Sequence, residues 1–222
     1  DGYLWLGTEY GLVRFDGVQA VPWQPPSNQH LPSNEIDRLL AGRDGTLWIG
    51  TSKGLVSWKD GKVTAYPEVG EYKVVTLLED RDGAVWVGVL SFFSPANLCA
   101  IRNGRVQCSG QEGRLGVGVL SLYEDSKGNL WAGVQDGVWR WKPGPPQFYS
   151  VPNQDPNFGI GALAEGDDGA PLIATDRGIR RLVDGKFEPF PLPGPARQFN
   201  ARFLLRDRDG GLWIGTVGEG LI

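Results

Sequence analysis

The sequence predicts an all-β fold, a β-propeller built of four-stranded antiparallel blades. One phrase, Asp-Gly-Tyr-Leu-Trp-Leu-Gly-Thr in its first copy, occurs six times, and turn glycines and short apolar runs fill the stretches between the copies. The Trp of the phrase, or the Leu that replaces it once, stands at positions 5, 48, 86, 131, 172 and 213. A period near 40 residues with this composition is typical of propeller blades.

Each repeat carries four strand signals. The first is a run that is apolar on both faces, which predicts a fully buried innermost strand. These runs cover residues 36–40, 74–78, 119–123, 160–164 and 203–205. The second strand is the Trp phrase itself, whose Trp is expected to be buried between neighbouring blades. The third begins at a Gly-Leu or similar pair such as Gly54-Leu55, and the fourth is shorter and more polar, as in Lys62–Tyr66.

The repeats divide the chain, taken as a single propeller fragment over residues 1–222, into four complete blades with a partial blade at each end. The partial blades are 1–24 and 203–222, and the complete ones are 36–66, 74–108, 119–150 and 160–190. Propellers close with about four to eight blades. Either the last partial blade completes the first in a five-bladed ring, or the parent protein has more blades, which we favour.

The two ends of the strands are predicted to differ. The turns after the first and third strands are tight Asp-Gly or Asn-Gly turns, whereas long connections collect at the other end. These connections run over residues 23–35, 67–73, 109–118, 151–159 and 191–202. Because binding residues usually sit on variable loops of a rigid scaffold, we expect the ligand on this loop face.

Composition excludes several functions. The net charge is −4 and no basic block is present, which argues against nucleic acid as a partner. No apolar run approaches the ~20 residues of a membrane helix, and no signal peptide is evident. The chain has no Met and opens inside a repeat, so we expect it to be a piece of a longer protein.

The two cysteines flank a predicted hairpin. Asn103-Gly104 is a strong signal for a two-residue turn, and counting outward from it places Cys99 directly opposite Cys108. At a non-hydrogen-bonded pair of this kind the Cα atoms lie about 4.5–5.5 Å apart, within disulfide reach. A disulfide would indicate an oxidising compartment, and two buried free thiols are the alternative.

The chain resembles the two-component regulator propeller repeats. The matching text is Leu31-Pro32-Ser33-Asn34-Glu35-Ile36 leading to the phrase at 44–51 and to Gly54-Leu55, and the resemblance extends over essentially the whole chain. These repeats form periplasmic sensor regions of membrane-spanning hybrid histidine kinases, whose parents commonly carry two seven-bladed propellers, a further β domain, a membrane helix and a kinase. The resemblance implies a sensor on the periplasmic or extracellular side of a membrane-anchored parent, with no cofactor and a ligand that is often derived from carbohydrate.

Three patterns suggest chemistry that their context does not support. The pairs Asp80/Asp82 and Asp207/Asp209 resemble the start of a calcium loop, but no further oxygen ligands follow, so we interpret them as turn residues. The glycines of 113–118 lack the Lys-Ser/Thr and the helix of a phosphate loop. His30 is the only histidine and has no evident Ser, Asp or metal partner, so no metal site and no catalytic residue are predicted.

The candidate ligand-binding residues are chosen by their place on the loop face and by side-chain type. Aromatic rings can stack on sugars or anchor a partner chain, and polar groups can orient a ligand. The set is Glu9, Tyr10, Trp23, Tyr72, Phe92, Phe93, Phe158, Arg197 and Asn200. Phe92 and Phe93 lie in an unusually long connection, and covering the edge of the adjacent blade is an equal alternative for them.

Three functions remain open. The first is a non-enzymatic sensor module that binds a small molecule such as a glycan fragment and shifts the arrangement of domains or subunits, a homo-oligomer being one such arrangement. The second is a lyase of the streptogramin type, which would need a general base, expected to be His, and a metal. The third is a purely protein-binding propeller scaffold.

Overall fold

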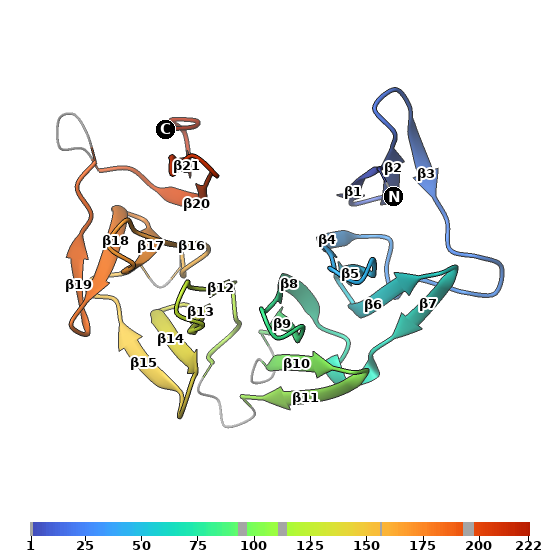
Figure 1. Cartoon of the computed structure of the whole chain (residues 1–222), viewed down its shortest axis with the longest axis horizontal. Coiled ribbons are helices and arrows are strands. Elements are labelled where there is room, and N and C mark those ends of the chain that lie inside the picture. Colours follow the sequence, from blue (N-terminus) through green and yellow to red (C-terminus); the bar gives the residue numbers. More distant parts are fainter. Residues whose placement is uncertain (1, 93–96, 111–114, 156, 193–197) are drawn as a thin grey trace. The chain divides into compact units, whose positions relative to one another are not determined.

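The computed structural model describes residues 2–92, 97–110, 115–155, 157–192 and 198–222, and nearly all of its regular structure is antiparallel sheet (Figure 1). The chain divides into two compact units, residues 1–118 and 119–222. Among the described residues, four sheets have four strands, and the first and last sheets have three and two. This confirms the predicted propeller fragment of four complete blades and two partial ones. Within the described ranges no helix is long and apolar enough to span a membrane.

Unit 1 contains the first three sheets, each joined in simple up-and-down order. The first sheet is β1 (Leu4–Thr8), β2 (Gly11–Phe15) and β3 (Ala20–Trp23). The second is β4 (Ile36–Ala41), β5 (Leu47–Thr51), β6 (Gly54–Lys59) and β7 (Lys62–Ala65). After the 3-10 helix η1 (Pro67–Val69), the third is β8 (Lys73–Glu79), β9 (Val85–Leu90), β10 (Leu98–Arg102) and β11 (Arg105–Ser109).

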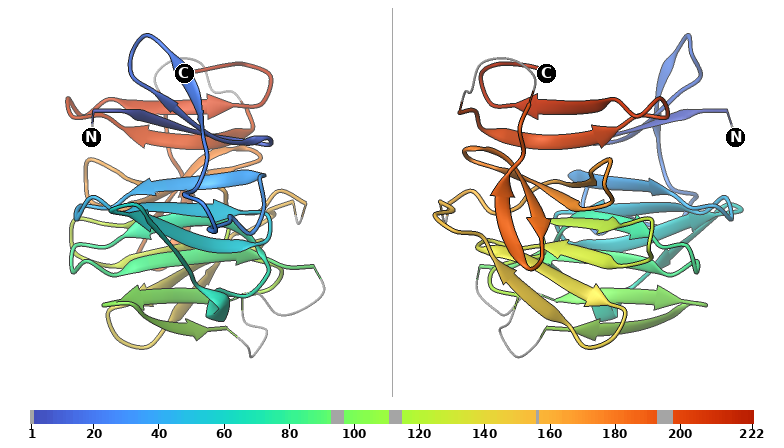
Figure 2. Two further views of the ribbon diagram at one scale, coloured as in Figure 1. Left: turned by 90° about the vertical axis from the view of Figure 1, so that its right-hand side faces the viewer. Right: turned by 60° about the vertical axis from the view of Figure 1, so that its left-hand side comes forward.

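Unit 2 repeats this order in the remaining sheets, which Figure 2 shows from two further sides. The fourth sheet is β12 (Ser121–Glu124), β13 (Leu130–Gly133), β14 (Gly137–Lys142) and β15 (Gln147–Ser150). The fifth is β16 (Leu163–Glu165), β17 (Pro171–Thr175), β18 (Gly178–Val183) and β19 (Lys186–Pro189). The last is β20 (Ala201–Arg206) and β21 (Leu212–Thr216), and the predicted third strand there is reduced to an isolated bridge between Gly215 and Leu221.

The core of each unit lies between neighbouring sheets, where the second strands are the most buried. Every residue of β5 and of β17 is buried. Trp48 of β5 packs with Val74, Val85 and Ile101 of the following sheet. In unit 2, Trp131 of β13 packs in the same way with residues of β16, β17 and β18. In these two sheets the Trp of the repeated phrase therefore faces the next sheet along the chain.

The prediction that the first strands are fully buried is wrong. Strands β4 and β8 are mostly only half-buried, and β20 exposes Phe203 and Leu205. The reason is their place in the sheet: each first strand is an edge strand with a partner on one side only. A second strand inside a unit, such as β5 or β17, has strands on both sides and a neighbouring sheet against each face, and it therefore carries the core.

An aspartate six residues before the Trp organises the turn between the first two strands. In the third sheet, Asp80 Oδ1 accepts the backbone N–H groups of Asp82 and Ala84 at 3.0 and 2.9 Å, and Oδ2 accepts the indole N–H of Trp86 at 2.8 Å. Asp125 binds Trp131 and Asp207 binds Trp213 in the same way, each at 2.8 Å. The first Asp of the Asp-x-Asp-Gly pattern thus accepts hydrogen bonds from the turn backbone and from the indole. This agrees with its interpretation as a turn residue.

Two copies hold this turn with a different carboxylate. Where the sequence has Gly42 or Gly166 in place of the aspartate, the Asp of the Asp-Gly turn takes over. Asp44 Oδ1 accepts the N–H of Thr46, and Asp168 Oδ1 accepts that of Ala170, both at 3.0 Å. The fifth copy, which has Gly166, also has Leu172 in place of the Trp.

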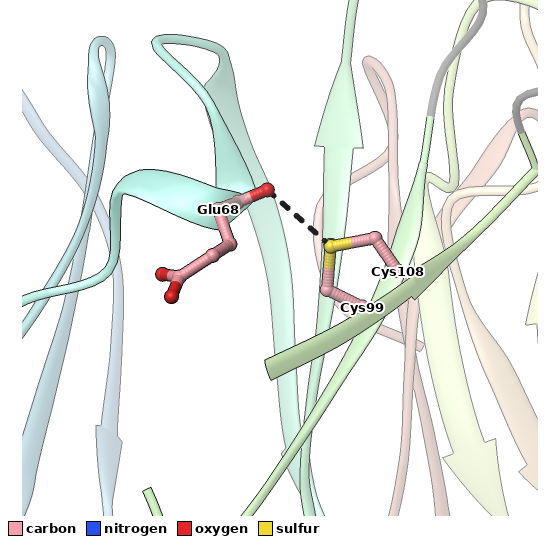
Figure 3. Close-up of a disulfide and its surroundings, with 3 residues drawn as sticks. All are labelled: Glu68, Cys99 and Cys108. Atoms are coloured by element: carbon pink, nitrogen blue, oxygen red, sulfur yellow. Dashed lines mark hydrogen bonds between the residues drawn. A yellow bond between two sulfur atoms is a disulfide. The ribbon is translucent and has the colours of Figure 1, made fainter. Parts of the chain in front are cut away.

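The hairpin β10–β11 has the predicted register. Asn103 and Gly104 both have positive φ, 49° and 74°, and Cys99 pairs with Cys108. The two sulfurs form a disulfide with a Cα–Cα distance of 4.0 Å. Cys108 Sγ also lies 3.5 Å from the carbonyl oxygen of Glu68 in η1, which places the disulfide against the connection from the preceding sheet (Figure 3).

The side chain of Gln29 lies along the outer edge of the second sheet. Its amide oxygen accepts the backbone N–H of Val63 in β7, and its amide N–H donates to the carbonyl of Gly61 at 3.3 Å. The Gln29 side chain thus covers part of the β7 edge of this sheet, beyond which no strand pairs among the described residues.

Candidate functional site

In each unit the first and third strands begin, and the second and fourth strands end, at one and the same end of their sheet. We call this end the loop face. In unit 1 the strand pairing places Thr8–Gly11 and Trp23 at the same end of the first sheet, opposite the Asp16-Gly17 turn. The candidate residues of the first sheet therefore share one end, as predicted.

Tyr10 and Trp23 line one pocket on the loop face of unit 1. The pocket has a volume of about 130 Å³, and residues 24–34 bring His30, Leu31 and Asn34 to it. Tyr10 lies in the turn between β1 and β2 and is 91% exposed. The pocket thus joins two aromatic side chains to polar groups from a non-repeating connection.

Trp23 is held from behind by two further tryptophans. Its ring lies 6.1 Å from that of Trp5 and 5.6 Å from that of Trp58, both in edge-to-face orientation. Such pairs contribute about 0.5–1.5 kcal/mol beyond the area that they bury. The cluster packs on the apolar core between the first two sheets, and it fixes Trp23 at the base of the pocket.

A lysine joins the second and third sheets at the same end. Lys73, the first residue of β8, lies 2.7 Å from Asp37 and 3.3 Å from Glu35. The hydrogen bond to Asp37, followed by that to Glu35, raises the pKa of Lys73 against the opposing effect of burial. The ion pairs hold the first residues of β8 next to the first residues of β4. They therefore fix the positions of the second and third sheets relative to each other at the loop face of unit 1.

In unit 2, Phe158 is brought into contact with Arg202. The guanidinium lies 4.3 Å from the centre of the ring, and its Nη1 donates to the carbonyl of Phe158 at 3.5 Å. Asn200 is half-buried, and its side-chain oxygen has no hydrogen-bond partner among the described residues. A cation stacked on an aromatic ring contributes about 0.5–1 kcal/mol at exposed sites, so this contact serves to hold Phe158 next to β20.

The structure does not bring the other candidates together. Glu9 is exposed beside Tyr10 but does not line the pocket, and Tyr72 lies half-buried with its ring against Gly70. Phe92, after β9, is 73% exposed. Phe93 and Arg197 lie outside the described residues.

Sequence reasoning missed Asn34 and Gln24 in the pocket and Arg202 under Phe158. Asn34 belongs to the non-repeating connection before β4. Nothing in the sequence of that connection indicates that residues 24–35 fold back over the first sheet. Arg202 could have been suspected from its place at the end of a long connection.

The acidic pairs do not form a metal site in the described part of the chain. No three His, Cys, Asp or Glu side chains lie close enough together there to hold a metal ion. His30 is exposed, and none of the described residues hydrogen-bonds its ring.

Three segments of the chain match the family model described as two component regulator propeller. They are residues 30–53, 113–136 and 198–218, and each includes a copy of the Trp phrase. The comparison with curated proteins finds no match.

Several solved structures share the fold. The extracellular domain of a protein described as a hybrid two component system of B. thetaiotaomicron is 23% identical with a TM-score of 0.75, over 100% of this chain and 31% of that one. PorZ, a surface component of the type-IX secretion system of Porphyromonas gingivalis, is 17% identical with a TM-score of 0.74, over 99% and 36%. Virginiamycin B lyase of Staphylococcus aureus, solved with quinupristin, is 15% identical with a TM-score of 0.71, over 96% and 74%.

These identities establish the fold alone. The chain spans about a third of the B. thetaiotaomicron protein and of PorZ, and about three quarters of the lyase.

Proposed function

We propose that this chain, which carries repeats of the two component regulator propeller family, is a non-enzymatic ligand-binding module of a signalling protein on the outer side of a membrane. The observation that carries the proposal is the loop-face pocket of unit 1, where Tyr10 and Trp23 meet polar side chains from a connection that does not repeat. Variable loops on a rigid repeat scaffold are where specificity is expected.

The pocket fits one ring of a glycan fragment. Trp23 and Tyr10 offer flat apolar surfaces for the C–H face of a sugar, and Gln24, His30 and Asn34 offer donors and acceptors for hydroxyl groups. Its volume of about 130 Å³ is below the ~300–1,000 Å³ of sites that enclose whole drug-sized ligands. We therefore expect one ring to enter the pocket while the rest of the ligand lies across exposed surface.

A library of neutral mono- and disaccharides tests the proposal by thermal unfolding. A ligand present at 100 times its Kd adds about 2.7 kcal/mol to the free energy of unfolding. Tyr10→Ala should abolish that gain without lowering the stability of the free protein, because Tyr10 is 91% exposed. Val18→Ala, at the opposite end of the same sheet and 85% exposed, is the matched control and should retain it. No gain with any saccharide would favour the protein-binding scaffold instead.

The lyase alternative is favoured by one observation, the presence of His30 in the pocket. A general base must be held within hydrogen-bond reach of its proton, and among the described residues nothing orients this exposed imidazole. Quinupristin is a direct probe. If the protein cleaves quinupristin and His30→Ala abolishes that turnover, the module is an enzyme.

We further propose that additional blades of a parent chain cover the two outermost sheets. Leu4 of β1 is 57% exposed, whereas Leu47, at the same place in the next copy, is 5% exposed. Phe203 and Leu205 of β20 are also exposed. The coding sequence on either side tests this, and it should supply more repeats, then a membrane helix and a kinase. A parent without them would remove the signalling role.

A further inference from the structure

A second hollow in unit 1 lies between two adjacent sheets, at the end of the strands opposite the loop face. We call it the inter-sheet groove. One wall is formed by β5, β6 and β7, and the other by β8, β9 and β10 with the turns at Gly83 and Asn103-Gly104. Its volume is about 660 Å³, within the ~300–1,000 Å³ of small-molecule sites.

The first wall of the groove presents hydroxyl groups on an aromatic base. The ring of Tyr66 packs on that of Trp48, with centroids 5.1 Å apart and planes 32° apart. The hydroxyls of Tyr66 and Ser57 lie 3.0 Å from each other, and Thr64 adds a third from the strand position opposite Ser57. A bond between two hydroxyls uses only one of their two hydrogens. The pair therefore retains one donor and several lone pairs for a ligand.

The ionic groups around the groove leave no net charge. Lys59 lies 2.7 Å from Asp44, and Glu79 of the facing sheet lies 3.1 Å from Arg43. The remaining charged side chains of the lining are Asp60 and Lys62, one of each sign. A phosphate or a free cation would need an excess of one sign here, so the lining favours an uncharged ligand.

The facing wall meets the first wall at an apolar floor. Val85 and Ile101, only 4% and 3% exposed, form this floor by packing against Trp48, and the Asn103 amide lines the groove above them. A ligand would therefore meet mainly the hydroxyl and amide groups, with only a narrow apolar strip beneath it. Sheet β8–β11 does not repeat the hydroxyl pair, because Ala100 and Ser109 stand at the strand positions of Ser57 and Tyr66.

We propose that the inter-sheet groove is a second binding site, for an uncharged polyhydroxylated molecule of the size of a short oligosaccharide. The site goes beyond the proposed function, because it lies at the other end of the strands and shares no residue with the loop-face pocket.

The test follows the indole N–H signals of ¹⁵N-labelled protein while maltose, cellobiose, lactose and chitobiose are added. We expect at least one of them to shift the Trp48 signal saturably. Tyr66→Phe keeps the ring and removes the hydroxyl, and should weaken that binding by about tenfold. Ser57→Ala installs the residue of the next sheet and should act similarly, which keeps the test valid if one variant is unstable.

Charge variants and charged probes test the ligand class. Lys53→Gln, which removes an exposed charge of the same sheet outside the groove lining, is the control and should leave the affinity for the neutral sugar unchanged. Tighter binding of glucuronic acid or glucosamine than of glucose would overturn the assignment of an uncharged ligand. No saturable shift of the Trp48 signal with any of the four disaccharides would overturn the site.

The proposals for the two sites can be contradicted independently of each other. Binding that survives Tyr66→Phe and Ser57→Ala but is lost in Tyr10→Ala would overturn the groove and leave the loop-face proposal standing. A neutral peptide that shifts the Trp48 signal where the sugars do not would also overturn the groove as a saccharide site.

Discussion

The two copies of the Trp phrase that carry the aspartate in unit 2 differ in one respect. Asp125 and Asp207 each bind the indole N–H of their Trp at 2.8 Å, and each holds the same turn. Yet Trp131 is 5% exposed and Trp213 is 45% exposed. The sheet that follows Trp131 covers it, and no described strand follows β21 to cover Trp213.

This difference separates what a repeat builds by itself from what its neighbour adds. The turn, the carboxylate and the indole bond form inside one sheet and persist at the end of the chain. Burial of the large apolar surface of the Trp needs a second sheet, as expected for repeats whose hydrophobic faces are covered only by stacking. Local geometry is thus set by each copy, and most of the stability comes from pairs of copies.

The largest expected effect on the free energy of unfolding comes from removing the two Trp rings. Trp131→Ala removes a buried aromatic side chain, and we expect it to lower the free energy of unfolding by about 3–5 kcal/mol. Trp213→Ala should lower it by roughly half as much, because nearly half of that residue is already exposed. Urea unfolding of both variants measures the two losses. Equal losses would mean that stacking of the next sheet is not what stabilises the phrase.

The second effect concerns the carboxylate. Asp125→Ala leaves the buried indole N–H of Trp131 and the backbone N–H of Asn129 without their acceptor, for an expected loss of about 1–3 kcal/mol. Asp207→Ala exposes the equivalent groups to water, which can replace the carboxylate. Its loss should therefore be smaller, and chemical denaturation at neutral pH tests both. A larger loss at Asp207 would contradict the role assigned to burial.

A smaller effect depends on pH and concerns the copy that uses Asp44. The hydrogen bond from Lys59, followed by those from Thr46, lowers the pKa of Asp44 from 3.8 to about 2. Since the folded-state pKa is the lower one, this contribution is present above about pH 4 and is lost as the pH falls toward 2. The side chain is 61% exposed, so solvent screening should limit the loss to less than about 1 kcal/mol.

Asp44→Asn measures this contribution. The variant should show a shallower fall in the free energy of unfolding between pH 4 and pH 2 than the unchanged protein. Parallel curves for the two proteins would show that Asp44 does not titrate as its contacts indicate.

The smallest effect sharpens the comparison by adding the missing carboxylate. A Cβ on Gly42 would lie 3.3 Å from the indole nitrogen of Trp48 and 3.1 Å from both Asp44 Oδ1 and the backbone oxygen of Thr46, so an aspartate there reaches the indole once these neighbours shift by a few tenths of an ångström. We expect Gly42→Asp to raise the free energy of unfolding by roughly 0.5 kcal/mol, through the new hydrogen bond and the loss of glycine's freedom in the unfolded chain. Gly166→Asp is the matched control: Leu172 has no indole, and thermal unfolding should show no comparable gain.

Much of the fold could be predicted because the chain repeats it. Alignment of six copies gave the number of sheets, the strand order, the Asn103-Gly104 hairpin and the pairing of Cys99 with Cys108. The Asp–Trp hydrogen bond could also have been predicted, because the same spacing of six residues recurs in Asp80/Trp86, Asp125/Trp131 and Asp207/Trp213. The burial of the first strands was misjudged because a run such as Val74–Leu78 has the same composition at a sheet edge as at its centre.

The candidate site was less predictable because its residues do not repeat. Tyr10 and Trp23 were placed on the loop face from the strand order alone. That His30 and Asn34 join them depends on the path of residues 24–35, which no second copy reveals. The inter-sheet groove could not be foreseen, since it needs Ser57 and Tyr66 in one sheet and Glu79 and Ile101 in the next at a distance set by packing.

The side chain of Gln29 affects how readily copies of the protein aggregate. An outermost strand offers unpaired peptide groups to any other chain, and this is a common route to aggregation. An amide side chain has one acceptor and donors in the arrangement of a peptide group, so Gln29 occupies the N–H of Val63 and the carbonyl of Gly61 as one residue of a further strand would. A glutamate could accept but not donate there. The identity of this one surface residue therefore bears on whether β7 stays closed to other molecules at high concentration.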